Sequence, residues 1–77
     1  IMGERLIGNR VFRLKHAENL KLKEIPQVME FKNGEEFHIV AGVLYMKGFP
    51  LPGGFQRPLM EWILNNPTKF VEDTRNF

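Results

Sequence analysis

The sequence predicts a small α+β domain: an antiparallel β-sheet followed by a C-terminal helix and a short second helical turn. Three observations predict it. Short runs in the first half alternate apolar and polar residues, as strands with one face on a core do. An Asn-Gly pair separates two strand-like runs. Apolar residues in the last third recur at helical spacing. With 77 residues, the chain 1–77 is expected to form a single domain.

The first three strands are expected at 10–15, 20–24 and 28–32. In the first of them Phe12 and Leu14 would face the core, while Arg13 and Lys15 would face solvent. Pro26 lacks a backbone donor, so it predicts a bend or a sheet edge between the second and third strands.

The Asn33-Gly34 pair predicts a tight β-hairpin. Type I′ turns need positive φ at both central residues, which Asn and Gly accept most readily. The third strand, 28–32, is therefore expected to pair antiparallel with the beginning of 35–47.

The longest apolar run, 36–50, is expected to be one long strand because it is rich in β-branched and aromatic residues and has no interior proline. Gly42 in its middle indicates a bulge or a closely approaching backbone. Both faces of this strand would be apolar, whereas a strand with one face on a core alternates. Either a second core covers the other face, or another molecule does.

The segment 49–54, FPLPGG, is expected to interrupt regular structure, because prolines stiffen it and glycines permit a sharp reversal. Pro58 suits the first turn of a helix, so we predict a helix at about 57–65. The ends of the chain, 1–8 and 74–77, are expected to be flexible.

This helix would present Leu59, Trp62 and Ile63 to the sheet, since they stand at i, i+3 and i+4. Trp62 is expected to pack beside Phe31 or Phe37. After the helix, Asn66 would cap a second turn with Pro67 at its first position, and the apolar residues of this turn would be Phe70 and Val71.

Charge is distributed unevenly. Residues 1–23 hold six Lys or Arg against two Glu, a net charge of +4, and the remainder carries −2. A basic segment of this kind can meet nucleic acid or an acidic protein surface. Nucleic acid is the less favoured partner, because no aromatic-studded basic loop or recognition helix accompanies the charges.

No constellation of residues supports catalysis or metal binding. The chain has no Ser and no Cys, so the usual nucleophiles are missing. His16 and His38 lack metal-site spacing, and Glu35-Glu36 would point to opposite faces of a strand. We expect no enzyme, cofactor, metal or small-molecule substrate. We also expect no membrane contact, because no apolar run approaches the ~20 residues of a spanning helix.

An ordered series of short motifs resembles the small outer capsid protein of T-even-type bacteriophages. The motifs are Lys23-Glu24-Ile25, Phe37-His38-Ile39-Val40-Ala41-Gly42, Tyr45, Phe49-Pro50, Glu61-Trp62-Ile63, Asn66 and Phe70. The resemblance covers roughly Leu20 to Val71. The chain departs from the family by two extra residues around Asn33-Gly34, a shorter stretch before Glu61, and a poorly matching first twenty residues.

The resemblance implies a non-enzymatic decoration protein on the outer surface of the virion, made in the host cytoplasm during assembly. Such proteins bridge neighbouring major capsid subunits, meet one another as trimers and stabilise the shell. Aromatic, Met and Arg side chains dominate protein interfaces. The residues expected to contact the capsid lattice are Arg10, Arg13, Lys15, Tyr45, Met46 and Phe49.

Two other functions fit the same composition. One is a small phage or bacterial interaction module, such as an inhibitor of a host polymerase or nuclease. The other is a basic nucleic-acid-binding β module. Salt dependence separates the latter, because phosphate contacts lose affinity steeply as salt rises.

Overall fold

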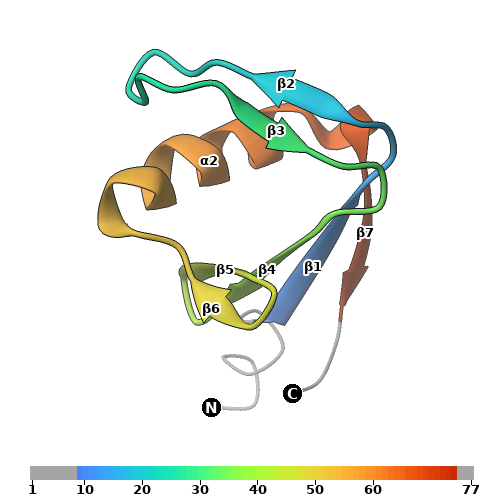
Figure 1. Ribbon diagram of the computed structural model, residues 1–77. Coiled ribbons are helices and arrows are strands. Elements are labelled where there is room, and N and C mark those ends of the chain that lie inside the picture. The colour runs from blue at the N-terminus through green and yellow to red at the C-terminus, as the bar shows by residue number, and fades with distance from the viewer. Residues whose placement is uncertain (1–8, 75–77) are drawn as a thin grey trace.

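Residues 9–74 are described by the computed structural model shown in Figure 1. The elements in chain order are β1 (Asn9–Leu14), β2 (Glu18–Leu20), β3 (Met29–Phe31), β4 (Glu36–Val40), β5 (Val43–Met46), β6 (Phe49–Pro50), α2 (Gly53–Asn65), the 3₁₀ turn η1 (Pro67–Lys69) and β7 (Phe70–Thr74). This confirms the α+β prediction of an antiparallel sheet with one helix and a short second helical turn. The expected flexible ends, 1–8 and all of 74–77 except Thr74, lie outside the described residues.

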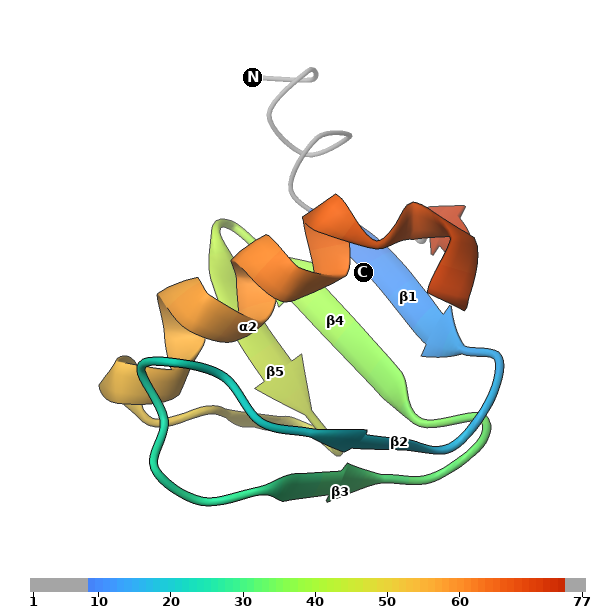
Figure 2. The same ribbon diagram turned by 90° about the horizontal axis from the view of Figure 1, so that it is seen from above.

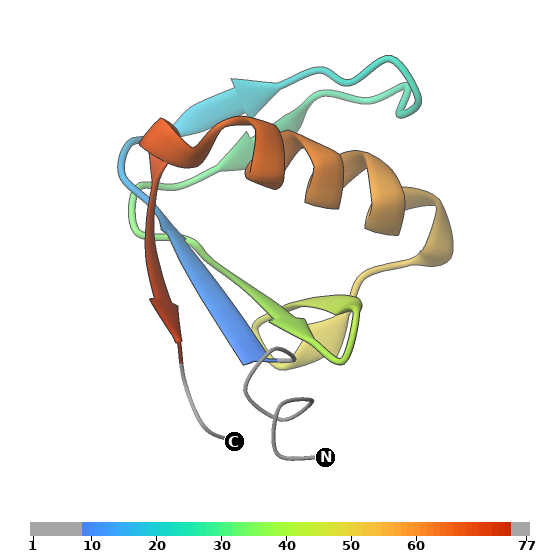
Figure 3. The same cartoon turned by 180° about the vertical axis from the view of Figure 1, so that it is seen from behind.

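Five antiparallel strands form the main sheet, in the order β6-β5-β4-β1-β7. Strands β2 and β3 form a separate two-stranded ribbon. Figures 1 and 3 show α2 and this ribbon on the same side of the main sheet. Viewed from above in Figure 2, the helix runs across β4 and β5. One face of the main sheet therefore carries the core, and the other is turned away from α2.

The main sheet and the ribbon are two parts of one long bent hairpin. The numbers of the paired residues add up to the same value in both parts, as in Arg13↔Glu36 and Glu18↔Phe31. The register is thus continuous from β1 into β2 and from β3 into β4. At the corner the Leu14 N–H donates to Glu35 O (2.9 Å), and the Gly34 N–H donates to Leu14 O (2.9 Å).

The predicted hairpin at Asn33-Gly34 is wrong, because the strands on either side of it pair with earlier strands and not with each other. A turn does form there, and the Glu35 N–H donates to Lys32 O over 3.1 Å. Gly34 has φ of +86°, but Asn33 does not have positive φ, so this is not a type I′ turn. The positive φ of Gly34 instead bends the hairpin at its corner.

The predicted single strand over 36–50 is also wrong, because two tight turns divide it into β4, β5 and β6. Two pairs of residues have positive φ: Ala41 (51°) with Gly42 (80°), and Lys47 (53°) with Gly48 (83°). The pairs Val40↔Val43 and Met46↔Phe49 close two-residue loops, as type I′ turns do. Gly42 therefore marks a turn, and no atom lies within 4 Å of where its Cβ would be.

The strand predicted at 20–24 is wrong, since the pairing of β2 stops at Leu20 and 21–28 form a loop. Lys21 Nζ donates to Leu22 O (3.2 Å) and Ile25 O (3.1 Å), which favours the loop over a ladder. Ile25 points inward and is 2% exposed. Pro26 lies in a bend, as expected. The strands predicted at 10–15 and 28–32 are confirmed as β1 and β3.

The helix begins at Gly53, four residues before the predicted start, so Gly53-Gly54 open the helix and Pro58 lies inside it. The 3₁₀ turn begins at Pro67, as predicted. Asn66 does not cap that turn with its side chain. It closes α2 instead, with Nδ2 donating to Trp62 O over 2.7 Å.

Phe70 and Val71 belong to a strand rather than to the second helical turn, so this part of the prediction was wrong. The Lys15 N–H donates to Lys69 O over 2.9 Å, which aligns the chain with β1 as it leaves η1. Pairing then continues from Leu14↔Phe70 to Arg10↔Thr74. The sheet thereby gains an edge strand that the sequence did not indicate.

Aromatic rings fill the space between the sheet, the ribbon and α2. Trp62 is 9% exposed and stacks on Phe31, with ring centroids 6.2 Å apart and planes at 23°. It also meets Phe70 edge-on at 5.3 Å, and Phe31 meets Phe37 edge-on at 5.1 Å. Ile63 and Phe37 are 0% exposed. The predicted packing of Trp62 beside Phe31 is confirmed.

One polar side chain ties the start of α2 to the sheet. Gln56 Oε1 accepts from the Leu44 N–H (2.8 Å), while its Nε2 donates to Leu44 O (3.0 Å) and Leu51 O (2.8 Å). The side-chain amide thus continues the β5 ladder where the chain leaves β6 for the helix.

Candidate partner-binding surface

The face of the main sheet turned away from α2 is called the outer face. Directly paired residues share a face of a sheet, and successive residues of a strand point to opposite faces. Phe12, Phe37 and Leu44 are buried on the core face, so the residues beside them in each strand, and the partners of those residues, lie on the outer face. The outer face carries Val11, Arg13, Glu36, His38, Val40, Val43, Tyr45, Val71 and Asp73.

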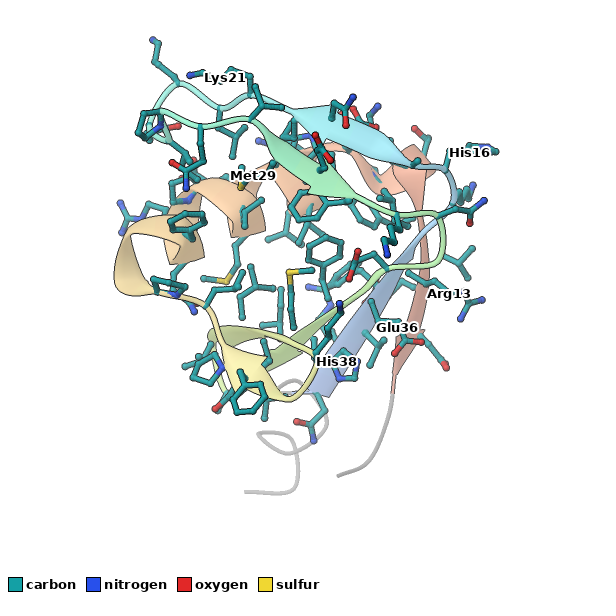
Figure 4. The ribbon with its side chains drawn as sticks, viewed as in Figure 1. Arg13, His16, Lys21, Met29, Glu36 and His38 are labelled. Atoms are coloured by element: carbon teal, nitrogen blue, oxygen red, sulfur yellow. The ribbon has the colours of Figure 1, made fainter. Side chains whose placement is uncertain are left out.

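The outer face combines exposed apolar area with charge. Val71 is 44% exposed and Val43 36%, whereas Val11 between β4 and β7 is only 1% exposed. His38 Nε2 and Glu36 Oε1 lie 3.0 Å apart and form a part-buried pair on β4, labelled in Figure 4. A surface with valines and charged groups side by side suits a protein partner better than a small ligand.

Tyr45 and Met46 were grouped by the sequence analysis, but the structure places them on opposite faces of β5. Tyr45 is paired with His38 and Pro50 on the outer face and is half-buried. Met46 packs against the core on the other face. Of the two, Tyr45 is the one that a partner on the outer face would reach.

Phe49 projects from the edge of the main sheet. It follows the Lys47-Gly48 turn as the first residue of β6 and is 74% exposed. Pro50 comes next and pairs with Tyr45, which fixes the strand. A rigid two-residue turn thus presents an aromatic ring to solvent.

Arg10 is engaged within the chain. Its Nε donates to Glu72 Oε2 (2.6 Å) and its Nη2 to Glu72 Oε1 (3.1 Å), and the guanidinium lies 5.0 Å from the centre of the Phe12 ring. The hydrogen bond to Glu72 raises the pKa of Arg10 against a smaller opposing effect of burial. Arg10 thus joins β1 to β7 rather than pointing at a partner.

Arg13 and Lys15 are exposed, as predicted. Arg13 lies on the outer face between Glu36 and Val71. Lys15 follows β1 at the corner of the bent hairpin. The structure therefore brings Arg13 and Tyr45 onto the outer face and places Lys15 at its margin. Phe49 pairs with Met46, so these two residues share the opposite face of the sheet, where Phe49 is exposed at the β6 edge and Met46 packs against the core.

The sequence predicted an apolar strand face that another molecule could cover, but it did not assign Val43 and Val71 to the contact surface. Each belongs to a strand whose existence or boundaries depend on turns and pairing across the chain. The alternation of FVEDT is too short to reveal β7 by itself. Had Ala41-Gly42 been interpreted as a two-residue hairpin turn, Val43 would have been placed at the beginning of a new strand, as the structure has it.

Within residues 9–74 no group of three or more His, Cys, Asp or Glu side chains could hold a metal ion. No helix in this part of the chain is long and apolar enough to span a bilayer.

No protein-family model, curated protein or solved structure matches this chain.

Proposed function

We propose that this protein is a non-enzymatic binding module for another protein, and that its partner is the outside of an assembled phage capsid. Phe49 is the observation that carries the binding proposal. It is the most exposed of the large apolar residues in the described part of the chain, at 74%. Aromatic side chains that enter a pocket of a partner contribute a large share of interface affinity.

The position of Phe49 supports this role. The Lys47-Gly48 turn and Pro50 hold the backbone around it, so little conformational freedom would be lost on binding. Tyr45, paired with Pro50, lies next to the same strand on the outer face. Val43 and Val71 extend the apolar area across that face.

The capsid is proposed as the partner because of the ordered motifs that resemble small outer capsid proteins. Several of these motifs are core or turn residues here: Phe37 and Trp62 lie in the core, and Ala41-Gly42 form a turn. Tyr45 on the outer face and Phe49 at the β6 edge are the exposed or half-buried motif residues of the proposed contact, which therefore includes the outer face and this edge of the sheet. A fold shared with small outer capsid proteins would explain the motif residues in the core and the turn. A shared capsid contact would explain the motif residues on the surface.

The mechanism is thermodynamic linkage. A ligand that binds only the intact lattice stabilises that lattice by mass action. Bridging of neighbouring capsid subunits, and trimers of the protein where subunits meet, would add avidity to weak single contacts. The protein would lie on the outer surface of the virion after assembly in the host cytoplasm.

A small phage or bacterial interaction module or inhibitor is the alternative, and it would use the same surface with one protein partner in place of a lattice. A nucleic-acid-binding module is less favoured. The exposed aromatic Phe49 and the exposed Arg13 lie on strands that β5 and β4 separate, so they form no combined stacking and phosphate-binding groove.

The test is attachment to purified capsids, followed by heating. Saturating protein should co-sediment with capsids and raise the temperature at which they rupture. Phe49→Ala should weaken attachment about tenfold or more, as removal of an interface anchor does. Leu64→Ala is the matched control, because Leu64 is 47% exposed near the C-terminal end of α2, whereas β6 leads into the beginning of that helix.

An unchanged rupture temperature at saturation would overturn the capsid proposal. Equal weakening by Phe49→Ala and Leu64→Ala would remove Phe49 from the contact surface.

A further inference from the structure

Three cationic side chains and a histidine lie where the long hairpin bends. Arg13 lies at the end of β1, Lys15 and His16 follow it, and Lys32 follows β3 on the other arm. The continuous register brings these two arms together at the corner, where Leu14 is bonded to Gly34 and Glu35. We call Arg13, Lys15, His16 and Lys32 the basic corner. Figure 4 shows Arg13 and His16 pointing outward on the same side of the molecule.

All four side chains are exposed, and none of them forms an ion pair with any residue from 9 to 74. Other cations nearby are engaged. Arg10 is paired with Glu72, Lys69 Nζ lies 3.2 Å from Glu18 Oε1, and Lys21 binds backbone carbonyls. Lys23, Lys47 and Arg57 also form no ion pair within residues 9–74, but they stand apart on separate loops, turns and α2. The corner is distinguished because its unpaired basic residues lie together on two adjacent arms of the hairpin.

The acidic groups around the corner are already used. Glu35 Oε1 accepts from the backbone N–H of Lys32 over 3.2 Å. Glu36 Oε1 lies 3.0 Å from His38 Nε2. Glu18 is paired with Lys69 on the ribbon side. The positive charge of the corner is therefore available to an external anion.

We infer that the basic corner docks a carboxylate-rich protein surface. The inference rests on the proposed function, because the basic corner would be the charged part of the surface that contacts the capsid. It predicts that the capsid exterior is acidic where the corner docks. Arg13 can bind a carboxylate through two parallel hydrogen bonds, and the lysines add point charges.

A nucleic acid fits this corner less well. Glu35 and Glu36 are half-buried at its border and would repel a continuous track of phosphates. The exposed aromatic that could stack on a base, Phe49, is three strands away from β1. The basic corner is a compact cluster bordered by acidic groups. It is therefore complementary to a protein surface with a small cluster of carboxylates rather than to a continuous line of phosphates.

Rim charges of this kind mainly raise the rate of association and fix the orientation of the partner. The sequence predicted that Arg10, within the basic N-terminal segment, would contact the partner. In the structure Lys32, from outside that segment, takes part, and Arg10 is turned to Glu72.

The experiment compares two double variants with the same loss of charge. Lys15→Gln with Lys32→Gln removes half of the basic corner. Lys23→Gln with Arg57→Gln is the control, because both residues are exposed, the first on the 21–28 loop and the second on α2. The probes are poly-L-glutamate and a 20-base-pair DNA duplex, each titrated over a range of salt. Circular dichroism melting confirms that both variants fold.

The corner variant should bind poly-L-glutamate about three- to tenfold more weakly than the parent, with a shallower salt dependence, since each exposed charge pair contributes modestly. The control should bind nearly as the parent does. Equal losses in both variants, or tighter binding of the duplex than of poly-L-glutamate by the parent, would overturn the inference. Neither probe contains a capsid, so this experiment is independent of the capsid-attachment test. If the protein binds poly-L-glutamate as expected but does not attach to capsids, the proposed function is overturned and the inference about the basic corner is not.

Discussion

At the scale of single residues, Trp62 is the side chain that connects the most parts of the fold. It belongs to α2, stacks on Phe31 of the ribbon and meets Phe70 of β7 edge-on. Trp62→Ala should lower the free energy of unfolding by about 3–5 kcal/mol, a large part of the stability of a domain of this size. Denaturant unfolding measures the change, and Leu64→Ala on the exposed side of the same helix is the control. A Trp62→Ala variant as stable as the parent would contradict the packing described above.

Gln56 should contribute to stability through hydrogen bonds rather than buried area. Gln56→Ala leaves the Leu44 N–H and the carbonyls of Leu44 and Leu51 without this partner, which should cost about 1–3 kcal/mol. The Leu44 amide should also exchange with solvent faster, as hydrogen-exchange NMR would show. Gln27→Ala is the matched control, because the Gln27 side chain is exposed in the 21–28 loop. Unchanged protection of the Leu44 amide would disprove this role.

At the scale of elements, two glycines should respond to the same substitution in opposite directions. Gly42 has φ of +80° in a tight turn, so Gly42→Ala should destabilise by about 1–2 kcal/mol. Gly54 lies in α2 with no atom within 4 Å of its Cβ position, so Gly54→Ala should stabilise by up to about 1 kcal/mol. Thermal melting of the two variants checks the signs. Two shifts of the same sign would contradict either the turn or the helix start.

Turns explain which elements could be predicted from the sequence. Asn33-Gly34 has the preferred composition of a hairpin turn, yet it forms a corner, because the arms on either side pair with β1 and β2. Ala41 and Lys47 are poor residues for positive φ, yet they form tight turns with the glycines that follow. Local preference thus gave way to the pairing of strands far apart in the chain.

Helical spacing and strand alternation succeeded where one face is buried. Phe12, Leu14, Leu59 and Ile63 are in the core as the patterns predicted. The candidate site was predicted less well, because whether a residue faces a partner depends on the face of its strand. Tyr45 and Met46 are neighbours in sequence, and only the strand boundaries show which of them points outward.

At the scale of the whole molecule, the main sheet separates stability from proposed binding. One face carries the aromatic core under α2, and the other carries valines and charges without contributing to that core. On that other face Val11 is buried and Glu36, His38, Val40 and Tyr45 are half-buried, so its exposed part lies at Arg13, Val43, Val71 and Asp73. In so small a domain this exposed part is available to a partner while the helix and the ribbon complete the core.

This division predicts opposite effects of two apolar substitutions. Met46→Ala should lower the free energy of unfolding by about 1–3 kcal/mol, because Met46 packs against the core. Since Met46 is also the cross-strand neighbour of Phe49, this substitution should weaken attachment below the melting temperature less than Phe49→Ala does. Val71→Gln should change stability by about 0.5 kcal/mol or less, because Val71 is 44% exposed on edge strand β7, but should weaken attachment. Calorimetric melting and capsid sedimentation, done on both variants, measure the two effects. If Val71→Gln attaches as tightly as the parent, the contact is confined to the Phe49 edge and the basic corner. If Met46→Ala weakens attachment without changing stability, the core-facing side of β5 is the binding surface instead.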